Sequence, residues 1–342
     1  MKRKRWLSQF FLLVFLMNLI VPVQALATEK PYKQNINLAV SYLKSIQNND
    51  GGFPWYQEDK ESDHVVTAWV VMALNAAEED VQASSWKKNG QNPIDYLVKQ
   101  KDKLESTNDY ARHLLALSTV NAYDEEKKQL ANKIKSWQKP NGHFSQIKFD
   151  EAGFINAHMW SILALTSVRE EVPNSEKAKK WLIAEQNKDG GFAWHQGLDS
   201  DLDDTAVAIQ VLINLGEDPK NSTVIKRALK YIKSSQQNDG GFSSGWAGSN
   251  SNASTDSWVW QALIAADEKH DGVNWTIKKK NVSTHLIGLQ DPSGYFRWMN
   301  EENKASVIDT AYAIMALSGK YMPVNIEPPE KVKPALFWLR IF

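Results

Sequence analysis

Gln186-Asn-Lys-Asp-Gly190-Gly-Phe192 decides the fold, because this seven-residue pattern returns along the whole chain. Close copies are Gln47–Phe53 and Gln236–Phe242, and looser copies are Gln138–Phe144 and Gln290–Phe296. A sixth unit, around Gln100, keeps the helical pattern but has lost the glycine turn. The copies recur at steps of about 49 residues, which is typical of architectures built from repeated structural units.

Each unit contains two kinds of helix. The first helix ends at the Gln and is amphipathic, as residues 39–46 show with apolar side chains at i, i+3, i+4 and i+7. The Asp-Gly-Gly that follows supplies residues that adopt positive φ and end the helix. The second helix is apolar on nearly all sides, as in Thr67–Leu74, Asp204–Leu212 and Asp309–Leu317. Such a helix must be covered by its neighbours, so the pattern predicts apolar inner helices inside an amphipathic outer layer.

Six such hairpins can stack as an open solenoid or close into a ring. An open solenoid needs polar capping units at its ends, and neither terminal unit of this chain has that character. We therefore predict an all-α fold, an α6/α6 toroid (barrel) of six helical hairpins around a central cavity.

The N-terminus has the pattern of a signal peptide. Basic residues 2–5 precede an apolar run over residues 10–23, and Ala25-Leu-Ala27 follows with the small residues of a cleavage site. We predict a signal peptide over residues 1–27, the toroid over residues 28–320 and a Pro-rich C-terminal tail over residues 321–342. The mature protein is then secreted or attached to the cell surface, and it retains no transmembrane segment.

Composition excludes several classes of function. The chain has no cysteine, which rules out disulfides, thiol nucleophiles and cysteine-ligated zinc. Four of the 40 basic residues lie in the leader, which leaves 36 against 40 acidic residues and no basic tract for nucleic acid. Residues 199–203 begin like a calcium loop, but Asp204 and Gln210 stand where that loop needs glycine and glutamate. We therefore predict no metal site and no cofactor.

The repeat resembles the Gln/Trp repeat of squalene and hopene cyclases. The pattern Gln-x-x-x-Gly-x-Phe after a helix, with Phe in the last aromatic place, carries the resemblance over about residues 33–320. The same toroid is found in protein prenyltransferase β-subunits and in the cobalamin carriers related to intrinsic factor. Because protein prenyltransferases bind zinc through an Asp, a Cys and a His, a chain without cysteine is not expected to be one of them.

Asp201-Leu-Asp203-Asp204-Thr-Ala206 resembles the Asp-x-Asp-Asp-Thr-Ala element of class II terpene cyclases. The resemblance implies that Asp203 is a general acid that protonates an alkene or epoxide, assisted by Asp201 and Asp204. It also implies an active site between this barrel and a second helical domain, for which the chain has no room. Asp109 and Asp309 stand at the place of Asp204 in other units, so we expect Asp204 to be the N-cap of its helix.

Aromatic residues form the second candidate site. Those that follow the glycine turns are expected together at one mouth of the ring: Trp55, Trp194, His195, Trp246 and Trp298. Others lie on the predicted inner helices: Trp160, Trp258, Trp260 and Tyr312. Aromatic faces can stabilise a carbocation or bind an apolar or flat ligand, such as an isoprenoid, a corrinoid or a glycan.

Three functions are compatible with these features. The first is a secreted toroid that binds such a ligand in its central cavity or aromatic mouth. The alternative is a class II terpene or squalene cyclase-like isomerase that uses Asp201, Asp203 and Asp204. The third is a cell-surface interaction domain with a filled ring. The position of Asp203 separates them, because the enzyme requires its carboxyl to face the hole.

Overall fold

The computed structural model describes residues 31–147, 153–245, 248, 250–300, 302 and 304–324. The chain divides into two units, residues 1–33 and residues 34–342, and the ring belongs to the second. Its inner helices are α3 (His64–Ala76), α5 (Thr107–Leu117), α7 (Ile155–Ser167), α9 (Leu202–Asn214), α11 (Ala253–Ala265) and α13 (Val307–Leu317). Its outer helices are α2 (Lys33–Ile46), α4 (Pro93–Lys99), α6 (Asp124–Lys135), α8 (Ser175–Ala184), α10 (Thr223–Ser234) and α12 (Val282–Gly288). Short 3-10 turns occur at Ser84–Trp86, Lys101–Lys103 and Val273–Trp275.

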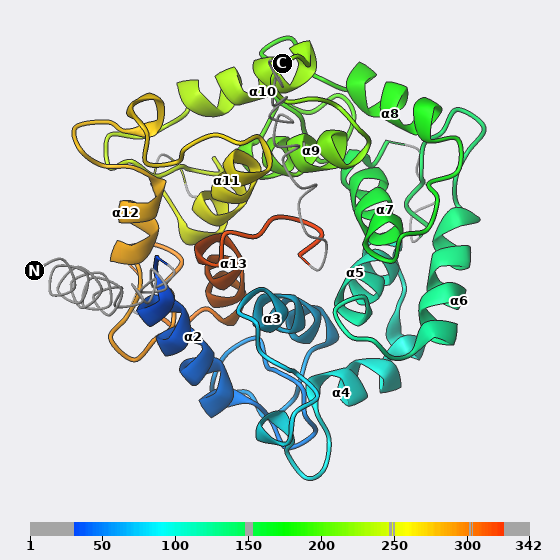
Figure 1. Cartoon of the computed structure of the whole chain (residues 1–342), viewed down its shortest axis with the longest axis vertical. Coiled ribbons are helices and arrows are strands. Elements are labelled where there is room, and N and C mark those ends of the chain that lie inside the picture. The colour runs from blue at the N-terminus through cyan, green and yellow to red at the C-terminus, as the bar shows by residue number, and fades with distance from the viewer. Residues whose placement is uncertain are drawn as a thin grey trace, which may run out of the picture. The chain divides into compact units, whose positions relative to one another are not determined.

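The inner helices form a closed circle. Each packs on the next along the chain, and α13 packs on α3, so the last unit meets the first. Figure 1 shows the six outer helices surrounding this circle. Among the described residues, β-structure is limited to isolated bridges such as the one between Phe192 and Asp201. The predicted all-α toroid is confirmed, and closure excludes the open solenoid.

The Gln of the repeat joins one unit to the next. Nε2 of Gln186 donates to the carbonyl oxygens of Gly190 and Val224, each at 2.8 Å. The same pair of bonds is made by Gln47, Gln138, Gln236 and Gln290. Gln290 reaches the carbonyl oxygen of Asn35 at 2.8 Å and thereby ties the last unit to the first.

The first glycine of the turn lies against the next outer helix. Gly190 has φ of +97°, and a Cβ there would come within 2.7 Å of the carbonyl oxygen of Arg227 on α10. Both the conformation and the close approach therefore require glycine. The Phe after the turn is fully buried, and the N–H of Phe192 donates to Oγ1 of Thr205 on α9 at 2.8 Å. The residues of the repeat thus fix the positions of the outer helix, the inner helix and the next unit relative to one another.

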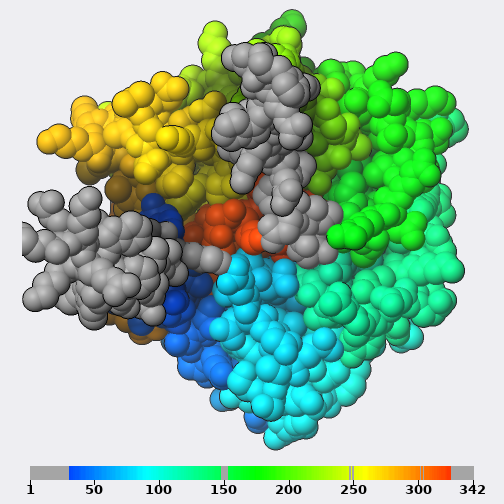
Figure 2. Space-filling model, in the orientation of Figure 1, coloured from blue at the N-terminus to red at the C-terminus, as the bar shows by residue number. Residues whose placement is uncertain are grey.

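The segment that follows α13 lies on one face of the ring. The N–H of Met322 donates to Oε1 of Gln210 at 2.8 Å, and Nδ2 of Asn214 donates to the carbonyl oxygen of Met322 at 3.1 Å. Figure 2 shows the red end of the described chain in the middle of this face. The opposite mouth is formed by the N-terminal ends of the inner helices.

Two sequence predictions fall outside the described residues: the signal peptide over residues 1–27 and the tail beyond residue 324. Within the described ranges, no helix combines the length and the apolar character needed to cross a bilayer.

Gln290→Ala tests the joint that closes the ring. The substitution removes two donated bonds and leaves the carbonyls of Asn35 and Gly294 without them, so the free energy of unfolding should fall by about 2 kcal/mol. Gln100→Ala is the control, because Gln100 is followed by no glycine turn, and it should cost less than about 0.5 kcal/mol. Urea unfolding followed by tryptophan fluorescence measures both. Equal losses in the two variants would show that the repeat Gln does not hold the ring together.

Candidate functional site

The inner helices present two layers of side chains to the centre of the ring. Residues two and six of a helix are four apart and therefore lie on the same face. The second residues, counted from each helix start, are Val65, Asn108, Asn156, Asp203, Ser254 and Ile308. The sixth residues are Trp69, Arg112, Trp160, Val207, Trp258 and Tyr312. Asp203 therefore lies one helical turn from the sixth-residue layer and nearer the mouth.

The sixth residues form an aromatic cluster. The ring of Trp69 packs edge-on against Trp160 at 5.4 Å, Trp258 at 5.6 Å and Tyr312 at 5.1 Å between ring centroids. Trp258 also contacts Trp160 at 5.7 Å and Tyr312 at 4.9 Å. These side chains come from α3, α7, α11 and α13, so they meet across the hole. The aromatic cluster therefore blocks the hole, and a ligand can bind only between this cluster and the mouth.

Arg112 completes this layer from α5. Its guanidinium lies 5.6 Å from the ring centroid of Trp69 and donates to Oδ1 of Asp109 at 3.2 Å. Burial opposes ionisation of Asp109, but the Ser106 hydroxyl and the charge of Arg112 hold the pKa of Asp109 below its usual value. The cation of this layer is thus already neutralised by a carboxylate.

Several polar atoms above the cluster are enclosed without a hydrogen-bond partner in the described structure. They are Oδ1 of Asn108, Oδ1 of Asn156, Oδ1 of Asp203 and Oγ1 of Thr255. Buried polar atoms are nearly always paired, and leaving one unpaired costs about 1–3 kcal/mol. The two amide oxygens, on α5 and α7, indicate a place where a bound molecule or water completes the site, whereas the Thr255 hydroxyl and Asp203 interact with each other.

The N-cap of α9 is Asp201, not Asp204 as the sequence led us to expect. The Asp201 carboxylate accepts the N–H of Asp204 at 2.8 Å, and Asp204 is the third residue of the helix. Ser106, Asn252 and Ser306 cap their helices in the same way, so Asp201 follows the repeat pattern. The error arose because the matching Asp-Thr-Ala motifs lie three residues beyond the caps. Asp203 is therefore the one carboxyl of the motif that the capping pattern does not explain.

The environment of Asp203 favours its protonated form. Burial is the main cause that raises the pKa of Asp203 to about 7, and the charge of Asp201 is the next. Thr255 opposes this effect, while Asp309 and Asp256 add to it. The side chain keeps some open surface although its Oδ1 is enclosed.

The pKa values of the neighbouring carboxyls are raised as well. Burial, followed by the charges of Asp201 and Asp203, raises the pKa of Asp204 well above its usual value. Burial also raises the pKa of Asp201, against backbone N–H groups that favour its ionised form. On α13, burial raises the pKa of Asp309, which accepts a hydrogen bond from the Ser254 hydroxyl. The mouth therefore holds several carboxyls that retain protons at higher pH than usual.

A cavity of about 400 Å³ opens at this mouth. Trp55 and Trp298 line its rim, and Ser254, Ile308 and Asp309 line its inner part. Trp55 is 45% exposed, which is unusual for a tryptophan in a folded protein. The structure thus brings two of the predicted rim aromatics to a cavity beside the carboxyl cluster.

The other predicted site residues do not line this cavity. Trp194 and His195 lie at the same mouth beside the start of α7, where the carbonyl oxygen of Trp194 accepts the N–H of Asn156 at 3.1 Å and the two rings pack on Phe154 at 5.6 Å and 5.0 Å between ring centroids. Trp260 packs against His270 with tilted rings at 4.3 Å between centroids and is buried away from the central cluster, because residues two apart on a helix face different sides. Trp246 lies outside the described residues.

A second cavity, of about 910 Å³, lies at the C-terminal ends of α3, α5 and α7. It is larger than the cavity at the mouth, but its lining mixes charges of both signs, among them Glu79, Lys127, Arg169 and Glu170. None of the predicted site residues lines it. No group of three or more His, Asp or Glu residues suited to a metal ion is found in the described part of the chain.

Sequence reasoning missed Trp69, Arg112, Asn108, Asn156 and Thr255 as lining residues. Trp69 stands inside an apolar run, where it looks like a core residue. Trp69 can be recognised by its place as the sixth residue of an inner helix. This count works only where the first residue of each helix has been predicted correctly.

Comparison with known proteins agrees with this architecture. The prenyltransferase alpha-alpha toroid domain matches residues 12–105 and 110–271. Drimenyl diphosphate synthase of Streptomyces showdoensis is 29% identical over 148 residues, which are 42% of this chain and 26% of that protein. The same synthase of Streptantibioticus cattleyicolor is 27% identical over 228 residues, which are 65% of this chain and 35% of that protein. The matched part thus spans about a third or less of these relatives.

Solved structures share the fold at low sequence identity. A variant of the type II terpene cyclase MstE from Scytonema, in complex with its substrate geranylgeranyl dihydroxybenzoate, has a TM-score of 0.58 at 15% identity. That likeness covers 84% of this chain and 97% of the cyclase chain. The α-1,6-mannanase GH76A from Salegentibacter sp. HEL1_6 has a TM-score of 0.61 at 11% identity, over 84% of this chain and 98% of its own.

Asp203→Asn should stabilise the fold in a pH-dependent way. The pKa of Asp203 rises from 3.8 to about 7 on folding, so its protonation stabilises the native state at low pH and this contribution is lost as pH rises from 4 to 7. The variant escapes that loss, and at pH 7 it should be more stable by about 2 kcal/mol, a value reduced for partial exposure.

Urea unfolding of the wild type and the variant at pH 4, 5, 6 and 7 measures this difference. Subtraction of the two curves removes the contributions of other titrating groups, including the buried histidines. A difference that stays constant with pH would show that Asp203 is ionised as readily in the folded chain as in the unfolded one.

Proposed function

The chain belongs to the prenyltransferase alpha-alpha toroid family, and from that premise we propose that it is a class II terpene cyclase. Asp203 is the general acid, and an isoprenoid is the substrate. The observation that carries the proposal is the position of a carboxyl that favours its protonated form one helical turn from a cluster of aromatic faces.

The acid step requires a protonated carboxyl at the pH of the reaction. With a pKa of about 7, roughly half of Asp203 carries a proton at pH 7, whereas an ordinary aspartate is almost wholly ionised. Its proton adds to one carbon of a C=C bond, and the other carbon of that bond becomes the cation. Backbone N–H groups favour the ionised form of Asp201 against its burial, and the negative charge of that form favours the proton on Asp203.

The aromatic cluster then stabilises the cation as it moves along the chain. Each further C=C bond attacks the cationic carbon and closes a ring, and loss of a proton from carbon ends the sequence as an isomerisation. Trp69, Trp160 and Trp258 offer π faces, each worth about 0.5–2 kcal/mol to a nearby cation. Val207 is the smallest side chain of this layer and stands one turn below Asp203.

The charge of the mouth favours a substrate with an uncharged head group. Lys304 is the cation among the residues lining the 400 Å³ cavity, and Glu302 and Asp309 line it too. Arg112 is paired with Asp109. A diphosphate placed here would add two or three negative charges beside these carboxylates, at about 1–4 kcal/mol for each close pair. The drimenyl diphosphate synthases resemble this chain over only 26% and 35% of their lengths.

We place the reaction outside the cytoplasm, because the N-terminal residues have the pattern of a signal peptide. An apolar isoprenoid carried by the membrane can reach a protein at the cell surface. A water-soluble prenyl diphosphate is made inside the cell, so this location also favours an uncharged substrate.

A second candidate is a toroid that binds an isoprenoid or another flat ligand without converting it. The exposed Trp55 at the rim of the cavity favours this function, since exposed tryptophans often mark binding sites. Recovery of an unchanged ligand from the purified wild-type protein would support binding without catalysis.

Asp203→Asn should abolish cyclisation. Incubation of the wild type with geranylgeraniol or squalene should give cyclic isomers of unchanged mass, detected by gas chromatography with mass spectrometry. Loss of the general acid should lower the rate by about 10²–10⁴-fold. Asp124→Asn is the control, because Asp124 is exposed at the start of α6, away from the site, and it should retain full activity. Equal rates in wild type and Asp203→Asn would refute the assignment of the acid.

The same assay tests whether the site prefers an uncharged or an anionic head group on the substrate. Geranylgeraniol and geranylgeranyl diphosphate have the same hydrocarbon chain, so their comparison isolates the charge. We expect kcat/KM for the alcohol to exceed that for the diphosphate at least tenfold, because the carboxylates repel the anion. Faster conversion of the diphosphate would show that the mouth accepts an anionic head and would place the chain with the diphosphate cyclases.

A further inference from the structure

The glycine turn of a unit packs on the outer helix of the next unit. In the turn that follows α8, Gly190 lies against Arg227 of α10. A Cβ on Gly191 would come within 2.9 Å of Cε1 of Tyr231, which is one helical turn further along α10. The glycine turn therefore fills the space between the end of one outer helix and the next outer helix.

The buried Phe after each turn packs on an inner helix. Its N–H is bound by the side chain of the fourth residue of that helix. These fourth residues are Thr67, His158, Thr205, Asp256 and Thr310, and they bind Phe53, Phe144, Phe192, Phe242 and Phe296 in that order. Five of the six units thus place a benzyl group and an N–H donor in the same space, between an inner helix and the outer layer.

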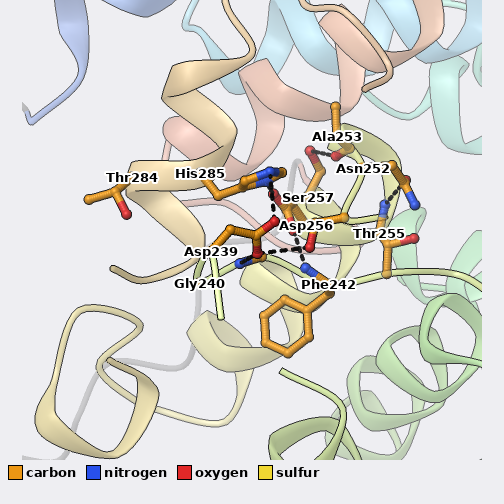
Figure 3. A network of polar contacts seen from close by, with 12 residues as sticks. Asp239, Gly240, Phe242, Asn252, Ala253, Thr255, Asp256, Ser257, Thr284 and His285 are labelled. Carbon is orange, nitrogen blue, oxygen red and sulfur yellow. Dashed lines mark hydrogen bonds and ion pairs between the residues drawn. The ribbon is translucent and has the colours of Figure 1, made fainter. Parts of the chain in front are cut away.

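The joint at the turn after α10 has charged side chains in place of Thr and Tyr (Figure 3). Asp256 stands at the place of Thr205, and its Oδ1 accepts the N–H of Phe242 at 2.8 Å. His285 of α12 stands at the place of Tyr231, and its Nδ1 lies 2.6 Å from Oδ2 of Asp256. The side chains that hold the turn therefore differ between units, whereas the buried Phe is kept.

The unit around Gln100 has neither the glycine turn nor the Phe. A 3-10 turn over Lys101–Lys103 follows the Gln, and the chain then reaches Ser106, the N-cap of α5. The fourth residue of α5 is Tyr110, whose ring packs on Trp137 at 5.0 Å between centroids. This unit therefore lacks the side chain that fills the same space in the other five.

A cavity of about 230 Å³ lies at this place, between α4, α5 and α6. Gln129 and Lys133 of α6 line it. They hold the same places before the repeat Gln of their helix as Arg227 and Tyr231, the contacts of the glycine turn, hold on α10. The cavity therefore occupies the space of the missing turn.

The inner wall of this cavity is largely apolar. Leu104 and His113 are buried there, and Val98 and Leu130 come from the two flanking outer helices. His113 is the seventh residue of α5. The seventh residues of the other inner helices are small or apolar: Val70, Ser161, Ala208, Val259 and Ala313. Fourth and seventh residues share the face of a helix that is turned away from its second and sixth residues, so His113 faces the outer layer and not the hole.

Neither ring nitrogen of His113 has a hydrogen-bond partner in the described part of the chain. Nδ1 is enclosed, whereas Nε2 is not, so Nε2 is the nitrogen that a molecule in the cavity can reach. Burial is the main cause that lowers the pKa of His113 to about 4, and the neighbouring His64 is the next, so the imidazole is neutral at physiological pH. Buried polar groups are nearly always paired, so this side chain calls for a partner from outside the chain.

We propose that this cavity binds a small phenol, that is, one aromatic ring with a hydroxyl group. The ring takes the place of the missing Phe, and the hydroxyl bonds to Nε2 of His113. A hydroxyl suits either tautomer of the imidazole, because it both donates and accepts. An apolar cavity of about 150 Å³ holds benzene, so a cavity of about 230 Å³ has room for a ring with a few further atoms.

The rim of the cavity favours an uncharged ligand. Two basic and two acidic side chains line it: Lys101, Lys133, Asp102 and Glu126. Their charges balance, so the rim offers no excess charge that would select an ion. Because the cavity lies on the outer side of α5, this inference does not depend on the cyclase activity proposed for the centre of the ring.

The experiment compares p-cresol with p-fluorotoluene on the purified protein. The two molecules have nearly the same shape, but only p-cresol carries a hydroxyl group. An NMR titration should give p-cresol a Kd about tenfold lower, since p-fluorotoluene leaves Nε2 of His113 unpaired. In protein labelled with nitrogen-15 at histidine, p-cresol should also shift the Nε2 resonance of His113, which is identified by its absence in His113→Phe.

Two variants change the cavity and a third is the control. His113→Phe keeps a ring but removes both nitrogens, so it should weaken binding of p-cresol about tenfold and leave p-fluorotoluene unchanged. Leu130→Trp fills the cavity and should abolish binding of both molecules. His143→Phe is the matched control, because His143 is also a buried histidine whose pKa burial lowers to about 4, but it does not line the cavity. It should bind both molecules like the wild type.

Circular dichroism establishes that each variant is folded before it is titrated. An unchanged Kd for p-cresol in folded Leu130→Trp would show that the phenol binds elsewhere and would overturn the proposal. Equal Kd values for p-cresol and p-fluorotoluene in the wild type would refute the role of His113. Failure of the wild type to bind p-cresol at any soluble concentration would show that the missing turn leaves a void and not a site.

Discussion

The pair of hydrogen bonds donated by the repeat Gln is the constraint on which the ring depends. One bond ends the outer helix of a unit at its own glycine, and the other fixes that end to the next unit, as Gln186 does with Gly190 and Val224. An amide at the end of a helix can satisfy two carbonyls that would otherwise remain unpaired. Because Gln290 makes the same bonds to Gly294 and Asn35, the geometry repeats until the chain meets its own beginning.

Closure has an electrostatic consequence at the mouth. Six inner helices point their N-terminal ends to the same side, and each helix start carries about half a positive charge, or about three charges in all. This field offsets part of the repulsion among the first-turn carboxyls of α5, α9, α11 and α13. The fold can therefore hold several buried acids close together, and the balance among them decides which keeps its proton. Asp203 is the one that combines burial with a position facing the hole.

The repeat allowed the ring to be predicted from the sequence, because glycine turns and two helix types depend on local residues. The site was predicted only in part. Asp203 and Trp258 were found, but Trp260 was placed with them although a spacing of two residues turns it to the other side of α11. The cap was misplaced by three residues, since the Asp-Thr-Ala motif marks the joint with Phe192 and not the helix start. Contacts between units, such as Asp256 with His285, span 29 residues and leave no local pattern.

Differences between otherwise equivalent units are the most informative features of a repeated fold. The Gln bonds and the buried Phe are shared by most units and explain stability, so they carry no information about chemistry. Asp203 replaces Asn, Ser or an apolar residue at the second helix position, and the Asp256–His285 pair replaces Thr–Tyr at the neighbouring joint. Both departures introduce buried charge, which a ring built for stability alone would avoid. Because α9 and α11 pack on each other, both departures fall in one sector of the ring.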